Sequence, residues 1–228
     1  MKTEKRDVLR FLKRIGVDTR FVSVVLPYLY INNLRFSKFS RKREELVHKK
    51  YPQLQIVRST IFQKICTRSS KIIGDSLNPR EIVLIRTGPK VEDKVLEIIL
   101  EPYTRKYGIQ LIQKKFELEE IGKTLTHDFE VIALPLTLDH EVKNILNQIF
   151  TGKKIKMQSS QDKIEKIRLI YPLVNVPLNW IYGWLEVDAK AHHLEGDDKL
   201  VHEFLQFLET IIPQVRENIL KSSRFLSK

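Results

Sequence analysis

The chain has 228 residues, 42% hydrophobic and 30% charged, and its formal net charge is +12. This composition is typical of a folded protein with a sizeable core, and it excludes an intrinsically disordered chain. No apolar run approaches the roughly 18 residues of a membrane-spanning helix, and the N-terminus lacks the apolar run of a signal peptide. We therefore expect a cytoplasmic protein without a membrane partner. The excess of positive charge favours an anionic partner, most often a nucleic acid.

The single cysteine, Cys66, limits the metal and redox chemistry of the chain. One thiol cannot form an internal disulfide, a cysteine-rich zinc site or an iron–sulfur cluster, so we predict a small core residue. The other possible metal ligands gather in one polar stretch: His192, His193, Asp197, Asp198 and His202. Adjacent histidines in an irregular segment rarely converge on one ion. We expect neither a metal nor a cofactor.

The N-terminal third alternates short apolar segments with turn signals. Helical spacing of apolar residues predicts a helix over 5–15, which Gly16 ends. Residues 20–31 are mostly apolar and β-branched or aromatic, and Pro27 interrupts them, which predicts two short strands or an extended segment. A second helix is predicted over 54–66. The polar stretch at 69–79 predicts a loop, and it is the best domain boundary in the chain.

Residues 34–51 predict one amphipathic basic helix that Pro52 ends, with Phe39 and Leu46 as its anchors to the core. Its cations are the candidates for nucleic-acid binding: Arg35, Lys38, Arg41, Lys42, Arg43, Lys49 and Lys50. On a continuous helix, residues 35, 38, 42 and 49 would share one side and could follow a phosphate backbone. The alternative is a solvated charged face without a ligand.

The rest of the chain alternates strands and helices. Strands are predicted over 81–86, 109–112, 129–134 and 167–173, with intervening helices over 91–106, 116–125 and 138–150. A polar linker is predicted over 153–166, and helices over 178–187, 197–211 and 214–226. Repeated strand–helix units predict an α/β fold with a parallel sheet and flanking helices. We thus expect two domains, a basic helical region over 1–78 and an α/β domain over 79–228.

The turn after the first of these strands is the one candidate phosphate loop: Thr87, Gly88, Pro89 and Lys90, followed by Val91 and Glu92. Pro89 has no N–H to donate, and Glu92 places negative charge where a phosphate would bind. An ordinary strand–helix turn is therefore favoured over nucleotide binding, and we predict no useful affinity for ATP. Farther on, Asp139, His140 and Glu141 open a helix whose N-cap is predicted to be Thr137.

The order of these elements resembles the PP-loop ATP-pyrophosphatase domain of the tRNA 2-thiolation family, a HUP-like fold, over roughly 24–226. The family's phosphate loop SGGxDS aligns with 87–92, where Gly88 remains and Pro89, Val91 and Glu92 depart from the motif. Its second motif, GHNxDD, aligns with 135–140, where Leu138 and Asp139 match and the final Asp is His140. Segments 171–182 and 204–213 resemble its later motifs, and 24–50 resembles its zinc-ribbon region without the cysteines.

This resemblance implies chemistry that the residues do not retain. Active members carry a catalytic CxxC between the two motifs, whereas this chain has no cysteine after Cys66. We therefore expect a pseudoenzyme without catalytic residues, similar to the non-catalytic second subunit of the cytoplasmic tRNA 2-thiolation complex. The partners so implied are tRNA and an active PP-loop subunit. The alternatives are a stand-alone nucleic-acid-binding protein that retains only the fold, and an active adenylating enzyme.

Overall fold

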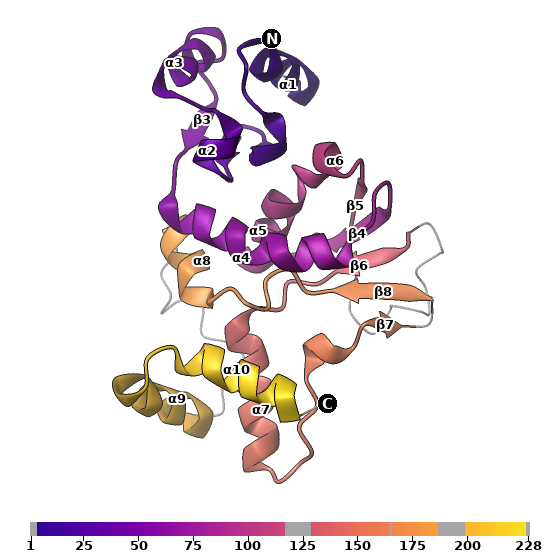
Figure 1. The fold of residues 1–228 in the computed structure, drawn as a ribbon, viewed down its shortest axis with the longest axis vertical. Coiled ribbons are helices and arrows are strands. Elements are labelled where there is room, and N and C mark those ends of the chain that lie inside the picture. The colour runs from indigo at the N-terminus through magenta and orange to yellow at the C-terminus, as the bar shows by residue number, and fades with distance from the viewer. Residues whose placement is uncertain (1–3, 117–128, 165, 187–198, 227–228) are drawn as a thin grey trace.

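The structure is a computed structural model that describes residues 4–116, 129–164, 166–186 and 199–226. Two sheets organise it (Figure 1). The N-terminal sheet has the order β1-β2-β3 and the larger sheet the order β5-β4-β6-β8-β7. No described helix is long and apolar enough to cross a membrane.

The N-terminal unit is built around its three short strands, β1 (Val22–Val25), β2 (Tyr28–Ile31) and β3 (Gln55–Val57). The first two are antiparallel and flank Pro27, as the sequence predicts, while β3 pairs with β2 in parallel. Helix α1 (Lys5–Arg14) buries Val8 and Leu12 in the core of this unit. A short 3-10 turn, η1 (Thr19–Phe21), leads into β1.

The prediction of a single basic helix over 34–51 is wrong. The structure has two helices, α2 (Leu34–Ser37) and α3 (Arg41–Lys50). Lys38 between them has a left-handed backbone, with φ of 55°, and the next residue, Phe39, is buried at 1% exposure. Ser40 then caps α3 by accepting a hydrogen bond from the backbone N–H of Arg43. Burial of Phe39 and the Ser40 cap thus outweigh the continuous helical pattern.

The helix predicted over 54–66 and the loop predicted over 69–79 are also corrected. Residues Gln55–Val57 form β3, and α4 runs from Thr60 to Ser76, capped by the Ser59 side chain. The helix therefore extends through most of the predicted loop. It buries Phe62, Ile65 and Ile73 in the same core as Val83 of the larger sheet. The division into domains at residue 78 stays a prediction.

The α/β part follows the predicted alternation. Its elements are β4 (Ile82–Arg86), α5 (Val91–Leu100), α6 (Tyr103–Lys106), β5 (Gln110–Lys114), β6 (Val131–Ala133), α7 (Leu138–Phe150), η3 (Gln158–Ser160), β7 (Lys163–Ile164), β8 (Ile167–Ile170), α8 (Leu178–Leu185), α9 (Lys199–Ile211) and α10 (Val215–Leu226). Strands β5, β4, β6 and β8 are parallel, which confirms the predicted sheet, while β7 adds an antiparallel edge inside the predicted linker. The helix predicted over 116–125 falls almost wholly outside the described residues.

The order of the parallel strands creates a switch point. The chain passes from β4 to β5 on one side and then returns to place β6 on the other side of β4. Connections therefore leave β4 and β6 in opposite directions, and a crevice opens outside their carboxyl ends. Ligands of doubly wound α/β sheets bind at this position, so the topology singles out the ends of β4 and β6.

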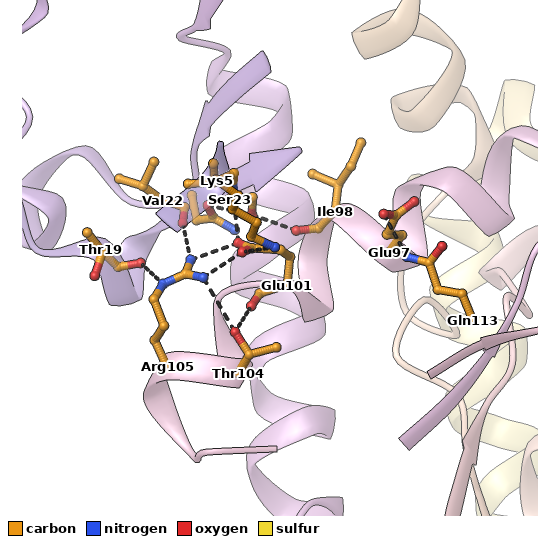
Figure 2. A network of polar contacts seen from close by, with 12 residues as sticks. Lys5, Thr19, Val22, Ser23, Glu97, Ile98, Glu101, Thr104, Arg105 and Gln113 are labelled. Atoms are coloured by element: carbon orange, nitrogen blue, oxygen red, sulfur yellow. Dashed lines mark hydrogen bonds and ion pairs between the residues drawn. The ribbon is translucent and has the colours of Figure 1, made fainter. Parts of the chain in front are cut away.

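A buried polar network joins the N-terminal unit to the α/β part (Figure 2). Glu101 is 2% exposed; its carboxylate accepts hydrogen bonds from Arg105 at 2.5 and 2.7 Å and from the backbone N–H of Val24 at 2.9 Å. Arg105 also donates to the carbonyl oxygens of Thr19 (3.0 Å) and Val22 (2.7 Å). Because the buried Glu101 and the partly buried Arg105 are paired, the network fixes the two parts against each other.

Candidate functional site

A cavity of about 150 Å³ lies at the switch point and is called the switch-point cavity below. Its walls follow the carboxyl ends of three neighbouring parallel strands, β4, β6 and β8. The lining residues are Arg86, Lys90, Glu92, Leu134, Pro135, Leu136, His140, Gln158 and Tyr171. Two cations, one carboxylate and one imidazole thus face a largely apolar pocket, the composition of a small-molecule site.

The loop aligned with the phosphate loop lies beside this cavity, and a carboxylate packs against it. Asp93, in the first turn of α5, is buried and pairs with Arg86 at 3.2 Å. A Cβ added to Gly88 would overlap the carboxylate of Asp93. Burial raises the pKa of Asp93 above its ordinary value, and the hydrogen bond from Arg86 partly opposes this shift. The N-terminus of α5 therefore carries the carboxyl groups of its own side chains at the position where a phosphate loop offers free backbone N–H groups.

The residues aligned with the second motif have separate roles. Leu138 is fully buried in the helical core. Asp139 accepts a hydrogen bond from the backbone N–H of Leu178 at 2.6 Å and pairs with Arg216 of α10 at 2.5 Å, so it joins α7 to α8 and α10. His140 alone lines the switch-point cavity.

His140 is the titratable group whose surroundings suit proton transfer. Burial lowers its pKa, so the imidazole is neutral near pH 7. Its Nδ1 lies 2.6 Å from the hydroxyl of Thr137. Thr137 occupies the predicted N-cap position of α7 but makes no side-chain cap bond; its hydroxyl contacts the imidazole instead. A neutral histidine in a cavity can accept or donate a proton.

The predicted nucleic-acid residues divide between two helices and a loop. Lys38, Arg41 and Arg43 line an open groove of about 670 Å³, called the basic groove below, together with Arg58. No carboxylate from the described ranges lines it. Arg35, Lys42, Lys49 and Lys50 are exposed outside it. Residues 35, 38, 42 and 49 do not share one side of a helix, because the chain turns at Lys38. Sequence reasoning missed Arg58, which follows a three-residue strand that it did not detect.

Internal contacts hold some of these cations in place. Arg58 pairs with Glu44 at 2.6 Å and donates to the carbonyl oxygen of Phe39 at 2.7 Å, and Arg43 donates to the carbonyl oxygen of Lys38. Val47 is fully buried, whereas the predicted anchor Leu46 is 42% exposed. The groove therefore has two fixed guanidinium groups in its wall and exposed cations at its rim.

The histidine-rich stretch considered for a metal falls mostly on 187–198, outside the described residues; of its members, His202 contacts the side-chain amide of Gln206 at 2.9 Å. Within the described part of the chain, no three His, Cys, Asp or Glu side chains gather to hold a metal ion.

No family model matches the chain, but known proteins resemble it in sequence and in fold. A probable sulfurtransferase of Methanocaldococcus jannaschii is 26% identical over 167 residues, which cover 67% of this chain and 49% of that protein. The chain thus spans about half the length of this relative. The solved structure of the U34-tRNA thiolase NcsA from Methanococcus maripaludis, with its [4Fe-4S] cluster, superimposes with a TM-score of 0.52 at 15% identity, covering 78% of this chain and 84% of that one.

The residues of this chain do not fit such a cluster. Iron–sulfur clusters are held by several cysteine thiolates, and the chain has only Cys66. Its sulfur accepts a hydrogen bond from the side-chain amide of Asn32 at 3.4 Å. Burial raises the pKa of the Cys66 thiol, which keeps it protonated near pH 7.

The comparisons contradict the expectation of a pseudoenzyme, because both matched proteins are named as enzymes. The predicted α/β fold is confirmed by the superposition. The chain is thus similar in sequence to a probable sulfurtransferase and similar in fold to a tRNA thiolase.

Proposed function

We propose that this chain is the tRNA-binding component of a tRNA sulfur-transfer enzyme and that it works with a PP-loop partner chain. The observation that carries the proposal is the basic groove, in which four cationic side chains and no carboxylate of the described residues line one open surface. Glu44, outside the lining, pairs with Arg41 and Arg58 and leaves the groove with a net positive charge. Cations arranged along a groove bind phosphates without regard to base sequence and release counterions as they do so. The net charge of +12 supports the same ligand.

The switch-point cavity is the place that we propose for the chain's part in the chemistry. It lies at the position where α/β sheets bind substrates, and it brings together Arg86, Lys90 and a neutral His140. The two cations suit a singly charged substrate group, and the imidazole can exchange a proton with it. Cysteine chemistry requires the partner, since Cys66 is not among the residues that line this cavity.

Charge reversal in and beside the groove tests the RNA-binding part. The variant carries Arg35→Glu, Lys38→Glu, Lys42→Glu and Lys49→Glu, all at exposed positions. We expect tRNA affinity to fall by at least about 100-fold at roughly 150 mM salt and the salt dependence to flatten. The matched control reverses four exposed lysines of the segment from the end of α7 to β7, Lys153, Lys154, Lys156 and Lys163. Equal loss in both variants would show that only net charge matters.

Isolation of the chain with its cellular partners tests the second part of the proposal. A co-purifying chain with intact SGGxDS and CxxC motifs is expected. If no such chain co-purifies and the isolated protein still binds RNA, the result would instead favour a stand-alone nucleic-acid-binding protein.

A further inference from the structure

A second, larger cavity lies where the N-terminal unit meets the α/β part. Its volume is about 310 Å³, and it is called the junction cavity below. One wall comes from the turns around β1 and β2, and the opposite wall from α4, the C-terminal end of α5 and α6. The switch-point cavity lies at the other end of α5, roughly 15 Å away by the rise of a ten-residue helix. The two cavities share no lining residue.

The interior of the junction cavity offers polar atoms that the fold does not fully use. Ser69 is fully buried on α4, and its hydroxyl is the one buried side-chain polar atom without a hydrogen-bond partner among the described residues. Asn32, also in the wall, is held by Ser23 (3.0 Å) and by Cys66 (3.4 Å). An unpartnered buried hydroxyl costs stability, and a ligand that hydrogen-bonds to it would recover that cost.

The mouth of the junction cavity is aromatic and cationic. The rings of Phe21 and Phe36 lie 5.3 Å apart, and Phe36 is 53% exposed. The Lys106 ammonium group lies 5.0 Å from the ring centroid of Tyr103 and 5.8 Å from that of Phe21, and it forms no ion pair with a described carboxylate. Arg20 also lines the mouth, but Asp18 pairs with it at 2.7 Å. Among the residues that the structure describes, no carboxylate lines the cavity.

We propose that the junction cavity binds a nucleotide, with its base beside Phe36 and Ser69 and its phosphate at Lys106. An exposed aromatic ring provides a stacking surface for any base, a hydroxyl and an amide can bond to the base edge, and the Lys106 ammonium group suits the phosphate. The volume falls at the lower end of the range for small-molecule sites. This inference deepens the proposed RNA binding and rests on it. The same chemistry serves an unpaired nucleotide of RNA and a free mononucleotide.

Two single substitutions test the proposal by fluorescence anisotropy of a labelled single-stranded octaribonucleotide, with a duplex of the same sequence as the second probe. Phe36→Ala removes the stacking surface and should weaken binding of the single strand about tenfold. Ser69→Ala should weaken it about fivefold while the melting temperature stays equal or rises, because an unpaired buried hydroxyl is removed. Neither should change duplex binding. Phe225→Ala, at a ring that is 79% exposed elsewhere, is the control and should change nothing.

Competition with adenosine 5′-monophosphate separates the two sources of ligand. Displacement of the oligomer at micromolar concentration identifies a free nucleotide, and displacement only at millimolar concentration identifies an RNA nucleotide. Unchanged single-strand binding in both Phe36→Ala and Ser69→Ala overturns the cavity proposal. If the charge-reversal variant of the basic groove loses affinity for the RNA while Phe36→Ala and Ser69→Ala do not, the proposed function stands and the cavity proposal fails. If the wild type binds no RNA and no mononucleotide, both fail.

Discussion

Helix α5 has buried carboxylates at both ends, and the two ends differ in how these charges are matched. At the C-terminal end, Glu101 is held by Arg105, by Lys5 and by a backbone N–H. At the N-terminal end, Asp93 has Arg86 beside it and the like charge of Glu92 next to it, and burial raises its pKa. Glu92 lines the switch-point cavity, whereas Glu101 is not among the residues that line the junction cavity at its own end of the helix.

The helix dipole explains why the two ends need different partners. A carboxylate at a helix N-terminus is stabilised by the dipole, so Glu92 and Asp93 can be buried there with fewer cations. A carboxylate at the C-terminus is destabilised, so Glu101 requires the surrounding positive charge. A buried carboxylate whose charge is balanced by several cations and hydrogen bonds therefore indicates a structural contact between two parts of the fold. A buried carboxylate with a shifted pKa beside a cavity indicates a candidate site.

The largest expected effect is at the matched end. Glu101→Ala leaves the buried guanidinium of Arg105 without its carboxylate, and we expect a loss of about 3–5 kcal/mol in the free energy of unfolding. Urea denaturation measures it. Lys5→Ala is the control, because Lys5 is 46% exposed at its side chain and such pairs contribute only about 0–1 kcal/mol. An equally small loss in the free energy of unfolding in both variants would show that the Glu101 network does not stabilise the C-terminal end of α5 as we expect.

At the cavity end, Gly88→Ala should cost about 1–3 kcal/mol, because its Cβ would overlap the buried carboxylate of Asp93. The same substitution in an Asp93→Ala background should cost much less, since the overlapping group is gone. Denaturation of the four proteins of this double-mutant cycle gives the coupling. A Gly88→Ala cost that is the same in both backgrounds would show that Asp93 does not restrict this turn.

The charge at this end also predicts ligand affinity. Calorimetry with ATP and magnesium should detect no low-micromolar binding to the wild type, since Glu92 and Asp93 oppose a phosphate there. The double variant Glu92→Gln, Asp93→Asn should bind at least about tenfold more tightly than the wild type, because it removes two like charges and frees Arg86 from its carboxylate partner. Tight binding by the wild type would overturn this account of the loop.

The smallest effect concerns pH. Burial lowers the pKa of His140 below its ordinary 6.5, so the folded state favours the neutral imidazole. Its contribution to stability is present above about pH 6.5 and is lost as the pH falls through the lower folded pKa. Thermal unfolding of the wild type between about pH 7.5 and pH 5 should therefore decline more steeply than that of His140→Asn. Parallel curves would indicate that His140 titrates as an exposed histidine does.

Much of the fold could be predicted from the sequence, because apolar runs separated by helical patterns identify β4, β6, α7 and β8 directly. The errors lie where long-range packing decides. Strand β3 pairs with β2 across more than twenty residues, and Lys38 is left-handed because Phe39 must reach the core. The signals Gly74 and Asp75 predict a loop, yet they lie within α4.

The candidate site was predictable only in part. The turn after the first α/β strand was identified, as was the adverse charge of Glu92. What the sequence could not show is that Asp93 packs against Gly88, or that His140 and Arg86 line one cavity, because these residues lie on different strand–helix units. Arg58 was missed since its groove forms only when β3 places it beside α3.

The network around Arg105 has a consequence for how the chain could measure a substrate. Because Arg105 bonds to the carbonyl oxygens of Thr19 and Val22, the N-terminal unit cannot rotate freely on the α/β part. The basic groove and the switch-point cavity are then held at a set separation and angle. If the groove binds RNA as proposed, the RNA would reach the cavity only when the span between its docked helix and its reacting nucleotide has the right length. Selection by length would therefore require no contact with base sequence.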